Sequence, residues 1–307
     1  MQQVQTAHQG RRKKWGRGAG IGFVLILPAV LGFLFFCAIP ILYSAYLSMT
    51  DWNIFKAPNF VGLKNYVKVF TNDYLFKEAI KATFKFAIGS TVCSSIYAFF
   101  LALLLNARVR GLSVYRTVFY LPSIVPSVAM CVLWTWLYNK DFGLFNSLLG
   151  TFGLPKQPFL TGQKTVIPSL IFMAMWSSGS TMIIYLAGIQ GVPESLREAV
   201  CIDGGNYWHE LVHVIIPMVS PVIFFNVLMS LVGSFQAFNQ AFLMTKGGPN
   251  NKSLFYGYYL YSTAFKQNKM GYACALGWVM FLIMIAFTAI FFKTFTKHVF
   301  FEGGDGE

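Results

Sequence analysis

The sequence predicts an all-α integral membrane protein with six transmembrane helices, and three observations lead to this fold class. Of its 307 residues, 56% are hydrophobic and 11% are charged, whereas about a quarter of the residues in a soluble domain are charged. Six apolar stretches are each long enough to cross a hydrocarbon layer of about 30 Å, which takes roughly 20 helical residues. Pro and Gly occur inside these stretches, and bent helices that line a cavity tolerate both.

We place the six spans at 21–47, 84–105, 117–138, 166–190, 219–243 and 272–293. The first span follows the basic run RRKKWGR but is too long for a signal peptide, so we interpret it as a retained anchor. The positive-inside rule then predicts a cytoplasmic N-terminus, and six spans return the C-terminus to the same side. The predicted organisation is a basic tail at 1–20, a transmembrane domain at 21–295 and a second tail at 296–307.

The charges in the loops agree only partly with this orientation. All arginines fall on the predicted inner side, but the predicted outer loops carry many lysines. These include Lys56, Lys64, Lys68, Lys77 and Lys81. We attribute the net charge of +13 to two groups of basic residues, those that set the membrane topology and the lysines of the loops. No basic stripe with interleaved aromatic residues indicates a nucleic-acid partner.

Acidic residues avoid the middle of every predicted span. Carriers driven by protons or ions commonly place ionisable residues inside the membrane as relays or ligands, so their absence argues against a self-powered carrier. The chain also has no G-x-x-x-x-G-K-[ST] phosphate loop. If the protein is a pump, another chain must hydrolyse ATP.

The predicted inner loop 191–218 is the most polar inner segment apart from the termini. Its sequence predicts a helix over 194–202, a break at Gly204 and Gly205, and a second helix over 206–216 that ends before Pro217. The second helix has a broad apolar surface. A cytoplasmic helical hairpin with exposed apolar side chains is a candidate docking element.

The same loop contains HELVH, the H-E-x-x-H pattern of zinc peptidases. The spacing puts His209 and His213 on one helix face, and Glu210 lies between them to activate a metal-bound water. A third ligand is missing, because His8 and His298 lie near the chain ends. An intramembrane zinc protease is therefore a remote alternative, and we expect no metal site and no catalytic residue.

The loop also resembles the signature motif in permease subunits of carbohydrate ABC importers. That motif begins Glu-Ala-Ala, continues through Asp-Gly and an aromatic residue, and closes on a hydrophobic residue and Pro. The matching residues here are Glu198, Ala199, Asp203, Gly204, Trp208 and Pro217. The chain departs from the motif at Val200 and Gly205, where Ala is usual. Further stretches, among them YRTVFYLPSIVPSVAM and TKGGPNNKSLF, extend the resemblance to the maltose- and glycerol-phosphate-type F/A permeases.

This resemblance implies a non-hydrolytic subunit in a bacterial inner membrane, with no cofactor of its own. The hairpin would be a coupling helix in a cleft of the ATPase, where Glu198 pairs with a basic residue, Gly204 permits the turn and Ala199 helps to fill the cleft. The implied partners are a second permease, which forms a heterodimer with this chain, two ATPase subunits that bind ATP and Mg, an extracytoplasmic solute-binding protein and membrane lipid. In this interpretation the HELVH match is accidental.

Polar residues cluster in the fourth and fifth predicted spans, the two that flank the coupling loop. We predict that the substrate is bound by Trp176, Ser177, Ser180, Ser230, Ser234, Gln236 and Asn239. A sugar needs hydrogen-bond partners and aromatic faces, although Ser and Asn are also common between packed helices. The lack of charge in this cluster favours a neutral sugar or oligosaccharide over glycerol phosphate or another polar solute. The outer segment 56–83 has two open interpretations, as a contact for the binding protein or as an interfacial helix.

Overall fold

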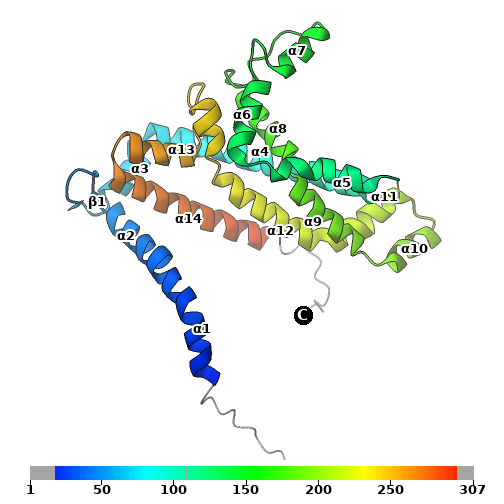
Figure 1. Cartoon of the computed structure of the whole chain (residues 1–307), viewed down its shortest axis with the longest axis horizontal. Coiled ribbons are helices and arrows are strands. Elements are labelled where there is room, and N and C mark those ends of the chain that lie inside the picture. Colours follow the sequence, from blue (N-terminus) through cyan, green and yellow to red (C-terminus); the bar gives the residue numbers. More distant parts are fainter. Residues whose placement is uncertain (1–17, 108–109, 296–307) are drawn as a thin grey trace, which may run out of the picture.

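The computed structural model describes residues 18–107 and 110–295, which are mostly helical. The predicted tails 1–20 and 296–307 lie outside the described residues except for 18–20, which begin a helix. In Figure 1 three long helices run along the molecule, namely α4 (Tyr74–Leu105), α12 (Ile216–Phe235) and α14 (Met270–Phe295). Helix α7 (Leu144–Thr151) protrudes to one side, and α1 (Gly18–Phe33) points away from the rest. The segment around residues 50–71 lies at one end of the molecule, far from the predicted hairpin 194–216 at the other end.

All six predicted stretches are helical, and four of them lie in helices long and apolar enough to cross a membrane. One of these four leaves regular helix briefly at 236–238. These four are Val24–Ser48, Tyr74–Leu105, Tyr207–Thr245 and Met270–Phe295. The other two are bent pairs, with an angle of 99° between Leu112–Ile124 and Ser127–Leu137 and of 52° between Val166–Trp176 and Gly179–Gln190. The described residues therefore give four spans, or six if each bent pair crosses once.

The bounds of the shorter elements place these spans in order. The first span joins α1 (Gly18–Phe33), the π-helical η1 (Leu34–Ala38) and α2 (Ile39–Ser48), and the second is α4 (Tyr74–Leu105). The third is α5 (Leu112–Tyr120), η2 (Leu121–Ile124) and α6 (Ser127–Leu137), and the fourth is α8 (Val166–Trp176) with α9 (Gly179–Gln190). The fifth contains α12 (Ile216–Phe235) and the π-helical η4 (Gln240–Thr245), and the sixth is α14 (Met270–Phe295).

Short elements close one end of the molecule, and we call residues 50–83 and 246–272 the end cap. It holds an antiparallel ribbon of β1 (Thr50–Asp51) and β2 (Asn59–Phe60), followed by α3 (Lys64–Thr71) and the first turns of α4. Its second part holds α13 (Tyr256–Tyr261) and the π-helical η5 (Ser262–Lys266). The two parts meet where the Gly271 amide donates to the Trp52 carbonyl oxygen at 3.0 Å. The cap thus joins the starts of α4 and α14.

A buried carboxylate explains why α4 begins ten residues before the predicted span at 84. Asp73, predicted to lie in an outer loop, accepts a hydrogen bond from the Phe76 amide at 2.9 Å and so caps the helix. Its other oxygen accepts bonds from the Tyr259 and Tyr272 hydroxyls, both at 2.5 Å. Burial and the Asp73 carboxylate raise the pKa of Tyr259, so its hydroxyl remains a donor. Asp73 therefore ties α4 to α13 and α14.

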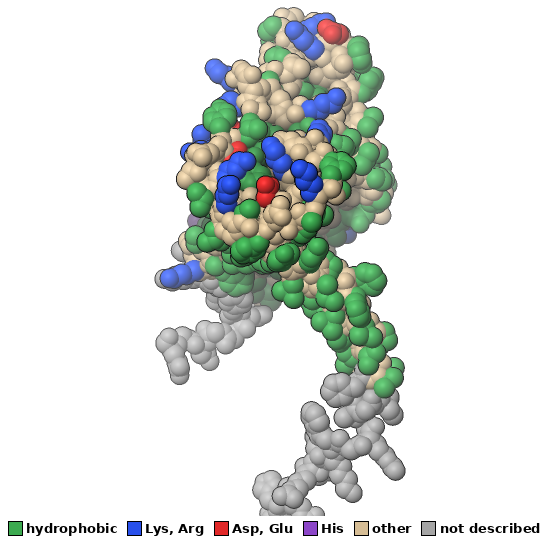
Figure 2. Space-filling view, turned by 90° about the vertical axis from the view of Figure 1, so that its left-hand side faces the viewer, with side chains coloured by type: hydrophobic (Ala, Val, Ile, Leu, Met, Phe, Trp, Pro, Cys, Tyr) green, Lys and Arg blue, Asp and Glu red, His purple; other side chains and the backbone are tan. Residues whose placement is uncertain are grey.

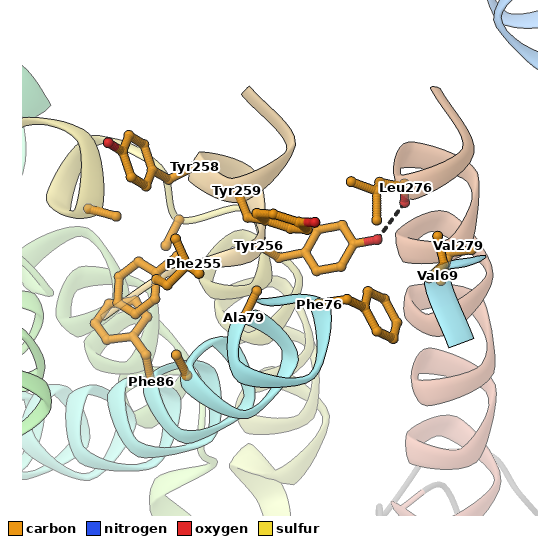
Figure 3. Close-up of a cluster of buried hydrophobic side chains, with 14 of the residues drawn as sticks. Val69, Phe76, Ala79, Phe86, Phe255, Tyr256, Tyr258, Tyr259, Leu276 and Val279 are labelled. Carbon is orange, nitrogen blue, oxygen red and sulfur yellow. Dashed lines mark hydrogen bonds between the residues drawn. The ribbon is translucent and has the colours of Figure 1, made fainter. Parts of the chain in front are cut away.

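Aromatic side chains pack beneath the cap (Figure 3). Phe76 packs edge-on against Tyr256, and Phe86 lies against Phe255, with ring centroids 5.9 and 4.7 Å apart. The Tyr256 hydroxyl donates to the Leu276 carbonyl oxygen at 2.7 Å, so this buried ring leaves no unpaired hydroxyl. This cluster fixes the cap on the long helices.

Candidate functional sites

The inner loop forms a helical hairpin at the end of the molecule opposite the cap (Figure 1). Its first arm is α10 (Glu194–Ile202), whose bounds coincide with the predicted helix. Gly204 has φ +76°, the Gly205 amide donates to the Val200 carbonyl oxygen at 2.8 Å, and the Gly204 amide donates to that of Cys201 at 3.1 Å. These two bonds form a Schellman turn, which favours glycine at the left-handed position.

Two polar contacts fix the hairpin. The Arg197 guanidinium on the first arm pairs with the Glu210 carboxylate on α11 (Tyr207–Glu210), and both side chains are partly buried. Asn206 caps α11, because its Oδ1 accepts bonds from the Trp208 and His209 amides at 3.0 and 3.1 Å. The two arms therefore behave as one rigid unit.

The second arm does not end before Pro217, so that part of the sequence prediction is wrong. The helix runs from Tyr207 through the π-helical η3 (Leu211–Ile215) and directly into α12. Proline lacks an amide hydrogen, so a regular helix would lose one backbone hydrogen bond at Pro217. The wider π turn just before Pro217 changes the hydrogen-bond pattern at that point. The hairpin is consequently continuous with the fifth span, and Pro217 lies away from the tip.

The hairpin exposes apolar side chains beside a carboxylate. Ile202 and Trp208 are 85% and 67% exposed, and the nearby Glu198 is also exposed. A cleft of about 1420 Å³ separates the hairpin from the ends of α4 and α9 and the start of α5; Glu198 and Trp208 are among its lining residues. A rigid hairpin that presents such a surface is suited to docking another protein.

The two departures from the Glu-Ala-Ala motif face each other. A Cβ at Gly205 would lie 2.5 Å from the Val200 Cγ1 atom and 2.9 Å from the Val200 carbonyl oxygen. The larger side chain at Val200 thus occupies the space that an alanine at position 205 would need. The two changes are complementary, and the hairpin keeps its turn.

The HELVH residues have local structural roles. The His209 and His213 rings lie on one helix face with centroids 6.0 Å apart, as the spacing predicts. However, His209 Nδ1 lies 2.7 Å from Asn206 Oδ1 within the helix cap, and Glu210 pairs with Arg197. Within 18–107 and 110–295, no three His, Cys, Asp or Glu side chains are grouped to hold a metal. Capping and pairing of the hairpin arms therefore account for these side chains.

The second candidate site is a group of three helix breaks. The chain leaves regular helix between η2 and α6, between α8 and α9, and between α12 and η4. Asn239, at the third break, donates from Nδ2 to the Ser127 hydroxyl at 2.8 Å, and Ser127 begins α6 at the first break. The second break joins them because α9 packs against α5 and η2. Backbone groups freed at such breaks provide hydrogen-bond partners for a polar solute.

Two predicted substrate residues contact α6 at separate points. Asn239 contacts Ser127, and Trp176 packs edge-on against Trp134 with ring centroids 5.6 Å apart. Ser127 and Trp134 are seven residues apart, so they lie on one face of α6 about 10 Å apart. The sequence analysis did not select Ser127, because it sought substrate residues only in the two spans that flank the coupling loop. The preceding Pro126 was the available signal for a helix start.

The other predicted substrate residues are more dispersed. Ser177 donates back to its own helix, to the Ala174 carbonyl oxygen at 3.0 Å. Ser234 accepts a bond from the Ser90 hydroxyl at 3.1 Å, across the contact between α12 and α4. Ser180 and Gln236 are exposed and Ser230 is half-buried. The hydrogen bond of Ser234 is that of a helix-packing residue.

Comparison with known proteins gives consistent similarities. Residues 94–299 match the family described as "Binding-protein-dependent transport system inner membrane component". The chain is 36% identical to the probable ABC transporter permease protein YesP of Bacillus subtilis, over 92% of each chain. It is 31% identical to the multiple sugar-binding transport system permease protein MsmF of Streptococcus mutans, over 85% of this chain and 89% of that one. The fold is also similar to that of a chain in the crystal structure of a bacterial alginate ABC transporter in complex with an alginate pentasaccharide-bound periplasmic protein. The two chains superpose with a TM-score of 0.80 at 22% identity, over 92% of this chain and 96% of that chain.

Proposed function

The chain belongs to the family of binding-protein-dependent transport system inner membrane components, and on this premise we propose that it is half of the translocation path of an ATP-driven sugar importer. The observation that carries the proposal is the rigid hairpin, which exposes Glu198 and Trp208 and continues without a break into α12. The relative named as a sugar-binding transport permease supports a sugar or oligosaccharide as the substrate.

In this proposal each bent pair crosses the membrane once, which gives six spans. The hairpin and both termini lie in the cytoplasm, and the end cap lies outside. The partners are a second permease, two ATPase subunits and an extracytoplasmic solute-binding protein. The ATPase subunits dock at the hairpins and themselves bind ATP and Mg. The chain itself catalyses no reaction.

Continuity between the hairpin and α12 supports a mechanical role. From Tyr207 to Phe235 the helical path is roughly 40 Å long at 1.5 Å per residue. When ATP draws two ATPases together, both docked hairpins move, and a rigid helix carries that motion to the break before Asn239. The break then opens or closes against α6, which alternates access to the path.

We propose that the sugar binds at the breaks, between Trp176 and Asn239. The Trp176 side chain is 38% exposed and supplies an aromatic surface for sugar C–H groups, and Asn239 and Ser127 supply hydrogen bonds. Ser177, Ser180, Ser230 and Gln236 remain predicted contributors to this path, whereas we assign Ser234 to helix packing.

Replacing Asn239 with Leu should weaken substrate binding about three- to tenfold, because a lost hydrogen bond costs about 0.5–1.5 kcal/mol. The measurement is the apparent KM for uptake into proteoliposomes. Asn226→Leu is the matched control, since Asn226 bonds only back along α12, to the Val222 carbonyl oxygen at 2.8 Å. Equal effects of both changes would contradict a substrate role for Asn239.

Affinity purification of the tagged chain in mild detergent tests the function itself. We expect an ATPase, a second permease and a solute-binding protein to co-purify and to be identified by mass spectrometry. The ligand of that binding protein then identifies the substrate. Recovery of the chain alone, with one zinc ion per chain, would contradict the importer and favour the protease.

A further inference from the structure

The end cap carries a net positive charge. Residues 50–83 and 246–269 hold nine lysines, three acidic residues and no arginine, a net charge of +6. The lysines are Lys56, Lys64, Lys68, Lys77, Lys81, Lys246, Lys252, Lys266 and Lys269, and all are exposed. Figure 2 looks onto this end of the molecule and shows basic side chains spread over the face, with few acidic ones among them. The proposed mechanism does not use this lysine face.

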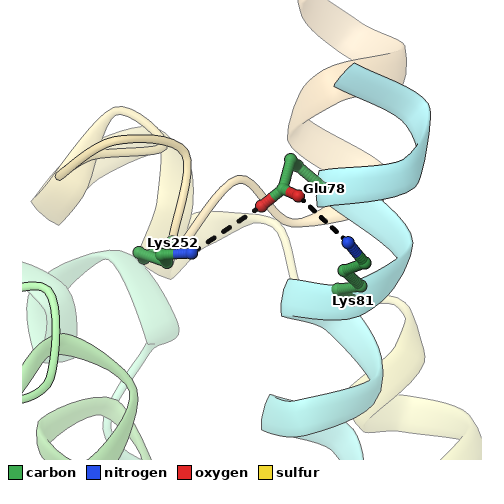
Figure 4. A network of polar contacts seen from close by, with 3 residues as sticks. All are labelled: Glu78, Lys81 and Lys252. Carbon is green, nitrogen blue, oxygen red and sulfur yellow. Dashed lines mark hydrogen bonds and ion pairs between the residues drawn. The ribbon is translucent and has the colours of Figure 1, made fainter. Parts of the chain in front are cut away.

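Two of the three acidic residues are already engaged. Asp73 is buried and bonded to Tyr259 and Tyr272. Glu78 is only 12% exposed and lies between Lys81 and Lys252, at 3.3 and 3.9 Å (Figure 4). An approaching molecule therefore meets exposed lysines with few accessible carboxylates among them.

The kind and breadth of this charge indicate a macromolecular partner. In the proposed orientation the lysines lie outside, where the positive-inside rule disfavours them, so another requirement must maintain them. Lysine is a mobile, strongly hydrated point charge, whereas arginine provides the planar, bidentate contacts that fix a small anion. The lysines are also distributed over the β-ribbon, α3, α4 and η5, an area wider than one sugar molecule. Such a field attracts and orients an acidic protein surface over about a Debye length, ~8 Å in physiological salt.

We propose that the lysine face is the docking surface for an acidic face of the extracytoplasmic solute-binding protein. The inference rests on the proposed function and adds the chemistry of the contact. The face covers the end of the helix bundle, and lysines lie across it as well as at its margin (Figure 2). This arrangement favours a protein partner over anionic lipid headgroups, which would be met at the margin.

The test compares three charge states of the cap. The complex, purified with its own binding protein, is placed in phosphatidylcholine nanodiscs, and the rate of binding-protein association is measured between about 25 and 300 mM NaCl. We expect the wild-type rate to fall at least tenfold with salt. The triple variant Lys56→Gln, Lys64→Gln and Lys77→Gln should associate about tenfold more slowly at low salt and respond less to salt. The corresponding Lys→Arg triple variant should keep the wild-type rate.

Two controls separate charge from other effects. Lys293→Gln removes one lysine charge at the opposite end of α14, away from the cap, and should leave the rate unchanged. The thermal midpoint of the Gln triple variant should match wild type, since all three lysines are exposed.

Different outcomes would overturn different statements. A wild-type rate that is independent of salt, or a Gln triple variant as fast as wild type, overturns the lysine docking surface and leaves the importer intact. If the Gln triple variant co-purifies with less phosphatidylglycerol than wild type before transfer into nanodiscs, and its association rate is unchanged, the docking surface is overturned in favour of lipid binding. Failure of any solute-binding protein to co-purify or associate overturns the proposed function and this inference with it.

Discussion

Replacing Gly204 with Val is expected to abolish transport. At φ +76° a β-branched side chain is strained by at least about 1–2 kcal/mol, and relief of that strain breaks both hydrogen bonds of the turn. The two arms of the hairpin then no longer present Glu198 and Trp208 together. We expect ATP hydrolysis stimulated by the loaded binding protein to fall more than tenfold in the reconstituted complex.

Gly204→Asn is the matched control for this change. Asn tolerates the left-handed conformation and also ends helices, so this variant should retain most of the stimulated activity. Membrane insertion of both variants is checked by the yield of detergent-extracted, monodisperse protein. Full activity of Gly204→Val would show that the turn is not required for coupling.

Reversing the charge of Glu198 is expected to have the second large effect. Glu198 is exposed on the hairpin, whereas the arms are held together by Arg197 and Glu210. Glu198→Lys should therefore leave the hairpin folded and repel the basic residue that we propose on the ATPase. The removal of one partner from a charged contact costs about 1.5–3 kcal/mol, and reversal costs more. We expect loss of ATPase subunits during purification and at least a hundredfold loss of uptake.

A graded series distinguishes docking from folding. Glu198→Gln should give an intermediate loss of ATPase retention, because it removes the charge without adding a repulsive one. Arg197→Gln breaks the pair between the arms and should lower the thermal midpoint, which Glu198→Lys should leave unchanged. An ATPase that stays bound to the Glu198→Lys protein would contradict the proposed role of Glu198.

The sequence by itself determined which stretches are apolar helices and where the hairpin turns. Hydropathy reports the transfer free energy of each segment, which depends on composition along the chain and not on neighbours in space. The ends of α10 followed from Pro193 and Gly204, because capping and left-handed turns are local preferences. The motif residues from Glu198 to Trp208 were identifiable through their resemblance to the permease motif, which is contained within one hairpin.

Only the tertiary structure decided how distant residues meet. The third span bends beside Pro126 and the fourth at Ser177 and Ser178, but neither local signal indicates which distant residue lies against a break, so the contact of Asn239 with Ser127 could not be read from the sequence. The bonds of Asp73 to Tyr259 and Tyr272 cross more than 180 positions, and they convert an apparent loop residue into the anchor of the end cap. The lysines, dispersed in sequence, form one face only because that cap closes over the helix ends. Such contacts depend on packing between segments, which no local pattern encodes.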